Sequence, residues 1–424
     1  VILRKIKRTT TMKLLHTADW HLGNAFYGYD REAEFKHYLA WLRQTLAEQQ
    51  PDVLLIAGDV FDHPNPSAEA EKMFFRFLCT AAEEVSGLQI VVIAGNHDSG
   101  ARLEAPAGLL YLHNIYVRGT IERLPDGTPD FDRLILPLSR RDNNEAEVVC
   151  FAVPYLRSGD YPAGMTQEEG LRYYFEQLWK HLRKSYFRGL PVIPLAHYYA
   201  ADARLSETEH SERLVVGGQD RVEGDVAGRD AAYIALGHIH RAQEVRERTF
   251  YAGSILPMSF SEKYYDHGAQ LIELDEEGRA GVSRLTYTPL RQLKSIPEKG
   301  AASAGEVLEL ISRLPRREKD DEGLGWPYLE LRVKEEQPEP QFLHDVTTAL
   351  QTKAVRFCRI LREQSEVTNA EHSMPDVVNV TTTTPLELAQ QVFQDKYGKP
   401  LPEALQTRFA EAAEDVITDR HADQ

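Results

Sequence analysis

The segment Gln89–Asp98, with the sequence QIVVIAGNHD, decides how the rest of the chain is interpreted. Its first half, Ile90–Ile93, is an apolar and β-branched run, which is typical of a strand buried on both faces in the middle of a sheet. The segment then ends in an amide, an imidazole and a carboxylate, at Asn96, His97 and Asp98. Because open α/β sheets bind ligands at the carboxyl ends of their strands, this ending indicates a chemical site at the edge of a sheet.

Four other hydrophobic runs end in the same way. They are Lys13–Leu15, followed by Asp19 and His21; Val53–Ala57, followed by Asp59 and Asp62; Val192–Ala196, followed by His197; and Tyr233–Leu236, followed by His238 and His240. A single histidine or aspartate after a strand is usually a cap or a turn residue. Five such endings, drawn only from metal-ligand residue types, are hard to ascribe to turns. They predict side chains that converge on one site.

Length and composition indicate a globular protein of two or three domains, because 424 residues exceed the size of one typical core. A hydrophobic content of 42% and a charged content of 27% are ordinary for such a protein. No apolar run approaches the ~20 residues that span a bilayer, so we expect no membrane segment. Cys79, Cys150 and Cys358 are widely spaced, which gives neither a disulfide framework nor a zinc motif and fits a reducing cytoplasm.

The formal net charge of −16 argues against a protein that binds nucleic acid by bulk electrostatics. It leaves room for a local site that takes an anionic substrate, since bound divalent cations would invert the local field. The basic stretch 1–11 lacks the apolar core of a secretory signal. Because Met12 stands directly before the first predicted strand, we expect residues 1–11 to precede the natural start of the chain.

Residues 12–287 are predicted to form one α/β domain in which strands alternate with amphipathic helices. Apolar residues at helical spacing predict helices around Phe35–Leu46, Phe74–Val85 and Leu171–Leu182. From Ile115 to Val153 the pattern becomes strand-like and contains turn signals. We therefore expect a layered β-sandwich, with some antiparallel sheet, flanked by helices.

Residues 288–370 are predicted to form a small α+β domain. The stretch Pro289–Gly305 is short of large apolar residues and is predicted to be a linker. The elements expected after it are a helix at Val307–Leu314, a strand around Leu329–Val333, a helix over Phe342–Leu350 and a strand around Val355–Ile360.

Residues 371–424 are predicted to be a linker followed by two short helices that form a tail. Thr384–Glu387 has the residues of a capping box at the start of the first helix. The second helix opens after Pro400 and carries Leu405 and Phe409 on one apolar face. Two short helices cannot bury such faces against each other alone. They dock on their own chain or bind a helix of a partner, and we favour the partner.

The side chains at the five strand ends suit a pair of divalent cations. Carboxylate, amide and imidazole donors without thiolates favour Mn²⁺, Fe²⁺ or Zn²⁺ over a closed structural zinc site. Six or seven donors are too many for one ion but suit two ions about 3.5–4 Å apart that share a bridging carboxylate, for which we choose Asp59. Two divalent cations carry more positive charge than the carboxylates of Asp19 and Asp59 neutralise. The remaining charge would bind an activated water and an anionic phosphodiester, so the predicted substrate is a phosphate ester.

These motifs resemble those of the calcineurin-like metallophosphoesterases, in order and intervals, over residues 12–260. The matching motifs are Asp19-x-His21, Gly58-Asp59, Gly95-Asn96-His97-Asp98, His197 and Gly237-His238-x-His240. More narrowly, the chain resembles the SbcD family of bacterial nuclease subunits, relatives of the double-strand-break repair nucleases of eukaryotes and archaea. The narrower resemblance is carried by Thr17–Gly23, by Gly253-Ser254 followed by Ser259–Glu262, and by the small domain and helical tail.

The resemblance implies a role for each motif residue. One metal ion would be held by Asp19, His21, Asp59 and His240, and the other by Asp59, Asn96, His197 and His238. His97 would not be a ligand: it would approach the scissile phosphate and stabilise charge or protonate the leaving 3′-oxygen, with Asp98 orienting it. Asp62 stands where relatives often carry a substrate-contacting side chain, which is sometimes histidine. Since His63 is adjacent, the substrate contact falls to Asp62 or His63.

The resemblance also implies a cellular role. It implies a cytoplasmic homodimer whose tail binds the coiled coil of an SbcC-type ATPase, with residues 288–370 capping the site or binding DNA. The complex would act as an exonuclease on double-stranded DNA ends and as an endonuclease on hairpins and single strands, in DNA repair, recombination and replication. Mn²⁺ would be the preferred metal and ATP would be hydrolysed by the partner. The acidic charge of this chain agrees with an ATPase that supplies much of the DNA binding.

Two alternatives stay open. The first is a small-molecule phosphodiesterase or phosphatase with the same metal site, against which the two additional C-terminal units argue. The second is a non-catalytic scaffold with a vestigial metal site, against which the presence of every expected ligand argues.

Overall fold

The computed structural model describes residues 12–204, 221–222, 225–335 and 340–364, together with isolated positions between 386 and 408. The chain separates into two compact units. The first unit consists of Val1–Lys294, Arg316–Glu330 and Ala354–Arg359, and the second of Ser295–Pro315, Leu331–Lys353 and Ile360–Gln424. The domain boundaries expected from the sequence, after residues 287 and 370, stay predictions.

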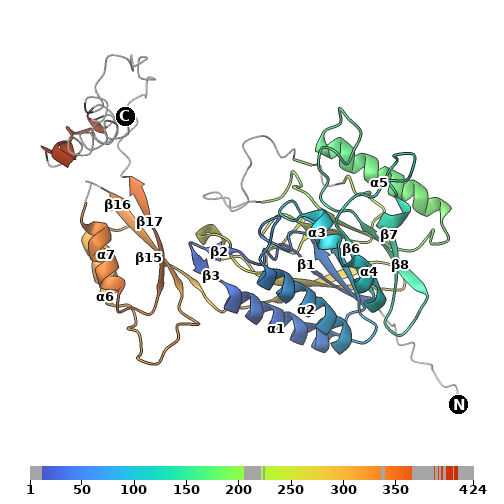
Figure 1. Ribbon diagram of the computed structural model, residues 1–424, viewed down its shortest axis with the longest axis horizontal. Helices are drawn as coiled ribbons and strands as arrows, with labels where there is room; N and C mark the ends of the chain where they lie inside the picture. Colours follow the sequence, from blue (N-terminus) through green and yellow to red (C-terminus); the bar gives the residue numbers. More distant parts are fainter. Residues whose placement is uncertain are drawn as a thin grey trace, which may run out of the picture. The chain divides into compact units, whose positions relative to one another are not determined.

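The first unit is built on two six-stranded sheets that share one core, so the predicted β-sandwich is confirmed (Figure 1). One sheet has the order β14-β13-β1-β4-β5-β6 and consists of β1 (Met12–Thr17), β4 (Val53–Ala57), β5 (Gln89–Ile93), β6 (Ile115–Arg118), β13 (Gly268–Leu274) and β14 (Ala280–Thr286). The other has the order β11-β12-β10-β9-β8-β7 and consists of β7 (Ile135–Ser139), β8 (Ala146–Ala152), β9 (Val192–His197), β10 (Ile234–Gly237), β11 (Gln243–Arg246) and β12 (Thr249–Tyr251).

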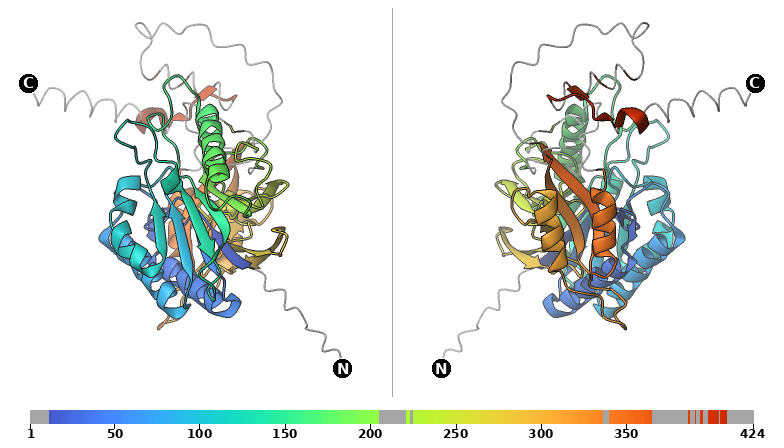
Figure 2. Two further views of the ribbon diagram at one scale, coloured as in Figure 1. Left: turned by 90° about the vertical axis from the view of Figure 1, so that its right-hand side faces the viewer. Right: turned by 90° about the vertical axis from the view of Figure 1, so that its left-hand side faces the viewer.

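Helices cover the outer face of each sheet, where the sequence periodicity predicts them (Figure 2). α1 (Glu32–Gln49) and α2 (Ala68–Glu84) pack on the first sheet, and α5 (Gln167–Lys184) packs on the second. The shorter elements of this unit are β2 (Ala25–Phe26), β3 (Tyr29–Asp30), α3 (Gly100–Glu104), α4 (Ala107–Leu110), η1 (Tyr111–His113), η2 (Asp132–Leu134) and η3 (Phe260–Glu262).

The central strand β4 shows why the site-bearing strands are apolar throughout. Its residues Val53, Leu55 and Ala57 face the core between the sheets, whereas Leu54 and Ile56 face the helices. Both faces of β4 are therefore buried. For this reason its residues are apolar at every position, whereas a strand with one exposed face alternates apolar and polar residues.

Parallel pairing brings the ends of these strands to one edge. β1, β4, β5 and β6 run parallel, with Thr17 opposite Ile56 and Ala57 opposite Ile93. In the second sheet β9 and β10 run parallel, with His197 opposite Gly237. Each polar motif follows its strand, so the register places all five motifs at the carboxyl ends of the two sheets.

The C-terminal part contains a three-stranded sheet in the order β15-β16-β17, formed by β15 (Leu293–Ile296), β16 (Tyr328–Glu335) and β17 (Arg356–Gln364). α6 (Ala304–Ser312) and α7 (Phe342–Leu350) lie side by side (Figure 2). The predicted order of helix, strand, helix and strand is confirmed. The prediction of a linker over Pro289–Gly305 is wrong for Leu293–Ile296, which form β15, and for its last two residues, which begin α6. Four residues with Lys294 and Ser295 in the middle carry too short an apolar signal to predict a strand.

Most of the predicted tail, including the Thr384–Glu387 capping box and Phe409, lies outside the described residues. Within the parts that are described, no helix combines the length and the apolar character that crossing a membrane requires. The three cysteines are free thiols.

His16 on β1 is a fully buried histidine of the sandwich core. Its Nδ1 lies 2.9 Å from the Tyr233 hydroxyl, and its ring stands edge-on to that of Tyr233. Its Nε2 is buried and has no hydrogen-bond partner among the described residues. Burial, together with the charge of Arg284, lowers the pKa of His16 to about 3. The folded protein therefore holds His16 neutral, whereas the unfolded chain binds a proton there below a pH of about 6.5.

His16→Gln should reduce the sensitivity of folding to acid. Since the unfolded state binds more protons at this position, its stabilising contribution is complete above pH 6.5 and is lost as the pH falls toward 3. As the pH is lowered from 6.5 toward 3, the free energy of unfolding should fall less steeply in the variant than in the wild type. The difference between the two slopes should reach up to about 1.4 kcal/mol per pH unit. Urea unfolding at several pH values measures this, with the exposed His344→Gln on α7 as control. Equal slopes for wild type and His16→Gln would contradict it.

Candidate metal centre

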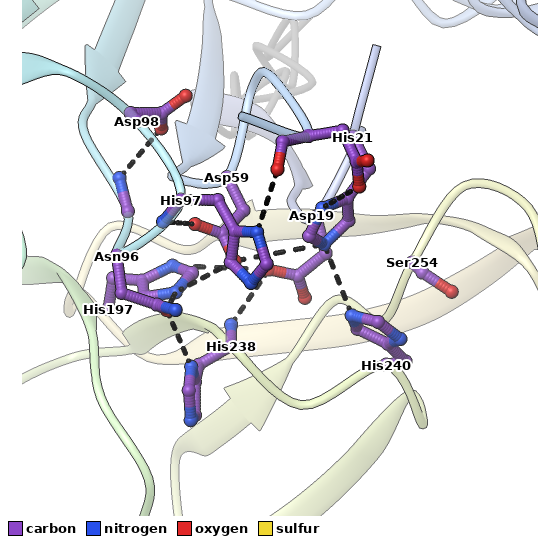
Figure 3. A network of polar contacts seen from close by, with 12 residues as sticks. Asp19, His21, Asp59, Asn96, His97, Asp98, His197, His238, His240 and Ser254 are labelled. Atoms are coloured by element: carbon purple, nitrogen blue, oxygen red, sulfur yellow. Dashed lines mark hydrogen bonds and ion pairs between the residues drawn. The ribbon is translucent and has the colours of Figure 1, made fainter. Parts of the chain in front are cut away.

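The structure brings all seven predicted metal ligands together where the carboxyl edges of the two sheets meet (Figure 3). The first sheet supplies Asp19, His21, Asp59 and Asn96, and the second supplies His197, His238 and His240. All except Asn96, which is half-buried, are buried. Side chains from distant parts of the sequence thus form one enclosed polar cluster between apolar layers.

Backbone hydrogen bonds continue past the strand ends and hold the motifs in place. The amide of Asp19 donates to the Gly58 carbonyl at 3.1 Å, and that of His21 donates to the Asp59 carbonyl at 2.9 Å. The amide of His238 donates to Asp19 Oδ1 at 2.8 Å, which joins the second sheet to the first.

Four of these residues have a backbone conformation that L-residues rarely adopt. The φ angles are 53° at Asp19, 45° at His21, 48° at Asp59 and 104° at His238. Positive φ at residues other than glycine costs free energy, and it persists where the surrounding structure imposes it, most often at functional sites.

Two glycines allow strand ends to approach closely beneath the site, Gly95 within the first sheet and Gly237 between the two sheets. A Cβ atom at Gly95 would lie 2.1 Å from Asp59 Oδ1, and one at Gly237 would lie 1.9 Å from the Ala57 carbonyl oxygen. Both distances are far below van der Waals contact, so any larger residue would separate the strand ends that carry the ligands. The glycines of the Gly-Asn-His-Asp and Gly-His-x-His motifs are therefore steric requirements of the site.

One set of donor atoms gathers around Asn96. Its Oδ1 lies 2.9 Å from His197 Nε2 and 2.9 Å from His238 Nδ1. His197 donates from Nδ1 to the Ala57 carbonyl at 2.8 Å, which directs its Nε2 toward the cluster. Asp59, His197 and His238 each place a ligand atom within 4.8 Å of the other two, which is close enough to hold one ion.

A second set of donor atoms gathers around His21. Its Nε2 lies 3.2 Å from His240 Nε2 and 3.7 Å from Asp59 Oδ2. The same Asp59 oxygen lies 3.4 Å from His197 Nε2 in the first set. Asp59 therefore lies between the two sets, where a bridging carboxylate would stand.

Burial and nearby charges shift the pKa values of neighbouring groups in the cluster in different directions. Burial raises the pKa of Asp19 to about 7. Burial opposes ionisation of Asp59 and His197 as well, but their mutual attraction holds the pKa of Asp59 well below its ordinary value and raises that of His197 to about 9. Burial and the charge of His197 lower the pKa of His238 to about 3. Such divergent pKa values within one buried cluster mark a functional site.

The donor set fits divalent metal ions. Asp19 Oδ2 is buried and has no hydrogen-bond partner among the described residues, although a buried carboxylate oxygen requires a proton, a donor or a cation. Nδ1 of His21 and Nδ1 of His240 each face a carboxylate oxygen, which favours the tautomer with the hydrogen on Nδ1. In that tautomer the two close Nε2 atoms are both acceptors, so a cation between them would remove their repulsion. Oxygen and imidazole donors without thiolates are those of an open transition-metal site.

His97 lies beside this cluster and is exposed. Its amide donates to Asp59 Oδ1 at 2.9 Å, and its ring stands edge-on to that of His21 with centroids 4.8 Å apart. Its Nδ1 lies 2.9 Å from the Asp62 carbonyl oxygen, so this nitrogen carries the hydrogen. The ring is thus held at the rim of the site.

Asp98 acts on the loop and not directly on the ring of His97. Its carboxylate accepts hydrogen bonds from the amides of Gly95, Val60 and Phe61, at 2.8, 3.1 and 2.9 Å. Burial and the nearby charge of Asp59 raise its pKa to about 6. The direct contact that would orient His97 is supplied by the Asp62 carbonyl, and Asp98 fixes the turn from which His97 projects.

The structure separates the two candidates for a substrate contact. The Asp62 side chain is 14% exposed, lies 3.4 Å from His21 Nδ1 and accepts a hydrogen bond from Asn24. The His63 side chain is 75% exposed and contacts Asp62 at 3.1 Å. Asp62 belongs to the rim of the ligand cluster, whereas His63 lies further out.

One buried residue of the site was not among the sequence-based candidates. Glu262 contacts His240 Nδ1 at 3.0 Å. It lies on η3, far from any strand that ends at the site, so the strand-end pattern could not indicate it. The signal in the sequence was its place in the Ser259–Glu262 segment, which carried part of the family resemblance.

Comparison with known families agrees with this geometry. Residues 12–242 match the family described as calcineurin-like phosphoesterase, which covers β1 to β10 and every ligand motif. The chain therefore belongs to the calcineurin-like phosphoesterases, a family of metal-dependent hydrolases of phosphate esters. Residues 287–397 match the family described as type 5 capsule protein repressor C-terminal domain, under the name SbcD_C.

Similar curated proteins narrow the class. The chain is 34% identical over 397 residues to the SbcD subunit of the SbcCD nuclease from Rhodobacter capsulatus, covering 90% of this chain and 94% of that protein. It is 31% identical over 375 residues to the corresponding protein of Escherichia coli K12, covering 84% and 86% of the two chains, and 33% identical over 271 residues to that of Bacillus subtilis, covering 62% and 66%. Within the phosphoesterases, the chain belongs to the SbcD family of nuclease subunits.

Proposed function

We propose that this chain is the nuclease subunit of an SbcCD-type complex and hydrolyses phosphodiester bonds of DNA, at double-stranded ends as an exonuclease and at hairpins and single strands as an endonuclease. The observation that carries the proposal is the buried convergence of Asp19, Asp59, Asn96 and four histidines beside the exposed His97. The curated relatives are named as nuclease subunits of the same complex, which supports DNA as the substrate and a role in repair, recombination and replication.

The proposed ligand sets are those implied by the family motifs. Asp19, His21, Asp59 and His240 hold one ion, and Asp59, Asn96, His197 and His238 hold the other. The contacts within each set and the position of Asp59 between them support this division. When bound, a pair of divalent cations makes a water molecule more acidic and supplies positive charge to the phosphoryl oxygens. Mn²⁺ is our choice of metal because the family resemblance implies it; the mixed oxygen and imidazole donors are compatible with Mn²⁺, Fe²⁺ or Zn²⁺.

His97 is the proposed group that acts on the leaving oxygen. Its Nδ1–H is engaged by the Asp62 carbonyl, so Nε2 is the nitrogen that faces substrate. In its protonated form, Nε2–H can stabilise the phosphoryl charge or donate a proton to the leaving 3′-oxygen. Asp62, at the rim, is the first candidate for a further contact to the DNA backbone, and the more exposed His63 is the second.

His97→Ala should keep the metal ions and lose catalysis. Because general acid catalysis contributes about 10²–10⁴-fold, we expect hydrolysis of hairpin DNA to fall at least ~100-fold. Hydrolysis of bis-p-nitrophenyl phosphate should fall less, because its nitrophenolate leaving group departs without a proton. Elemental analysis reports the metal content, and His181→Ala on α5, where the histidine contacts Asp132 away from the motifs, is the matched control. Unchanged cleavage of DNA by His97→Ala would overturn the role of His97. If the wild-type protein hydrolyses the small diester but no DNA, a small-molecule phosphodiesterase is favoured instead.

A homodimer is the proposed state of this protein. An exposed apolar group on α4 and η1 supports it, since Leu109, Tyr111 and Leu112 are 73%, 64% and 78% exposed. Large apolar side chains gathered on adjacent turns of a surface are typical of a protein interface.

Leu112→Asp should convert the dimer to a monomer, because in a two-fold interface one substitution places a buried charge on both partners. Sedimentation measures the expected twofold drop in mass. Tyr186→Asp, at a side chain that is 95% exposed outside this group, is the control and should stay dimeric. A wild-type protein that sediments as a monomer would contradict the proposal.

The C-terminal parts are proposed to serve the complex. We assign residues 288–370 to a small domain that caps the site or binds DNA, and residues 371–424 to a tail that binds the coiled coil of an SbcC-type ATPase. The match of residues 287–397 to a separate family supports a boundary near residue 287. We place the complex in the cytoplasm, which the three free cysteines support.

Removal of residues 382–424 should abolish co-purification with the ATPase while Mn²⁺-dependent hydrolysis of bis-p-nitrophenyl phosphate continues at the full-length rate. The reason is that the removed stretch carries apolar residues at helical spacing but none of the proposed site residues. Undiminished capture of the ATPase by the shortened chain would refute a binding role for the tail.

A further inference from the structure

Glu262 is a buried carboxylate next to the ligand cluster. It lies at the end of η3 and is 1% exposed. An ionisable side chain that is so completely buried needs partners for both of its oxygens. Those partners show what this residue does.

Each oxygen of Glu262 has a defined contact. Oε2 accepts the amide hydrogen of Met258 at 2.8 Å, and Oε1 lies 3.0 Å from His240 Nδ1. Because an ionised carboxylate can only accept, Nδ1 carries the hydrogen of this contact. In the neutral ring the lone pair is then on Nε2, the nitrogen that lies 3.2 Å from His21 Nε2 within the ligand cluster. Glu262 thus selects the tautomer of His240 that can bind a cation.

The segment that carries Glu262 is itself held in place. Arg31, which is buried, donates to the Pro257 carbonyl at 2.9 Å. Phe260, two residues before Glu262, is buried against Phe26 with ring centroids 5.6 Å apart. Because the carboxylate stands on a fixed segment, its contact fixes the orientation of the His240 ring as well as its tautomer.

We propose that Glu262 is the positioning residue of His240, and that one of the two metal ions depends on it. The inference rests on the proposed assignment of His240 as a ligand. It divides the site: the ion held by Asp19, His21, Asp59 and His240 requires Glu262, whereas the ion held with Asn96, His197 and His238 does not. A residue that only closed the turn after Met258 would affect folding and leave both metal affinities unchanged.

Glu262→Gln tests the proposal with little change in side-chain size. The amide has one acceptor oxygen for two donors, the Met258 amide and His240 Nδ1–H, so the pair of contacts cannot be kept. We expect the affinity for one of two Mn²⁺ ions to fall about 10–100-fold, as for other partners of ligating histidines, with the second ion retained. Titration calorimetry of the full-length, metal-free protein measures both affinities. Electron paramagnetic resonance should show the signal of a coupled pair replaced by that of an isolated Mn²⁺.

Asp52→Asn is the matched control. Asp52 is also a buried carboxylate that accepts two backbone amide hydrogens, from Lys13 at 2.8 Å and Arg141 at 3.0 Å, but it lies at the opposite end of β1 and β4 from the ligands. Its replacement removes a buried charge without touching the site, and both Mn²⁺ affinities should match the wild type. Equal losses in Glu262→Gln and Asp52→Asn would overturn the proposal.

Two further variants keep the inference and the proposed function distinguishable. If His240→Ala binds two Mn²⁺ ions as tightly as the wild type, His240 is no ligand and the proposed ligand set fails. If His240→Ala loses one ion but Glu262→Gln binds both normally, the positioning role alone fails. Should Glu262→Gln not fold, Glu262→Asp is the second test, because it keeps the negative charge on a shorter side chain. If this variant folds and binds both ions as tightly as the wild type, the Glu262 side chain is not needed to reach His240, and the positioning role is overturned.

Discussion

The buried Asp59 carboxylate, flanked by imidazoles from both sheets, is the interaction on which the rest of the structure depends. One of its oxygens lies within 3.7 Å of His21 and His197, and the other accepts the amide hydrogen of His97. A carboxylate buried between apolar layers is costly unless positive charge surrounds it. Without metal ions, His197 supplies positive charge, since its pKa is raised to about 9. Divalent cations bound at the site would supply that charge in its place. The sheet edges are therefore drawn together around a charge that neither sheet could bury alone.

The surrounding backbone keeps this arrangement in spite of its cost. Asp19, His21, Asp59 and His238 occupy unfavourable conformations, and the close approach at Gly95 and Gly237 leaves no space for a Cβ atom. These strained positions are tolerated because the strands that lead into them are buried on both faces and paired in fixed register. The apolar core between and outside the sheets stabilises the fold, and the functional side chains lie at the ends of the strands.

The sequence indicates most of this arrangement because strands and their endings are local features. Five apolar runs and their polar endings identify the seven clustered side chains, since parallel pairing brings the ends of such strands to one edge. Features that depend on contacts between distant segments are beyond such a pattern. Glu262 comes from a short helical turn and joins the site only through the fold. The rim position of Asp62, the loop contacts of Asp98 and the short strand β15 likewise follow from tertiary packing and not from periodicity.

Anomalous diffraction from crystals of the full-length protein grown with Mn²⁺ tests most directly whether Asp59 bridges a pair of cations. We predict two peaks about 3.5–4 Å apart, one on each side of the Asp59 carboxylate. A single peak, or two peaks of which neither contacts Asp59, would contradict the account.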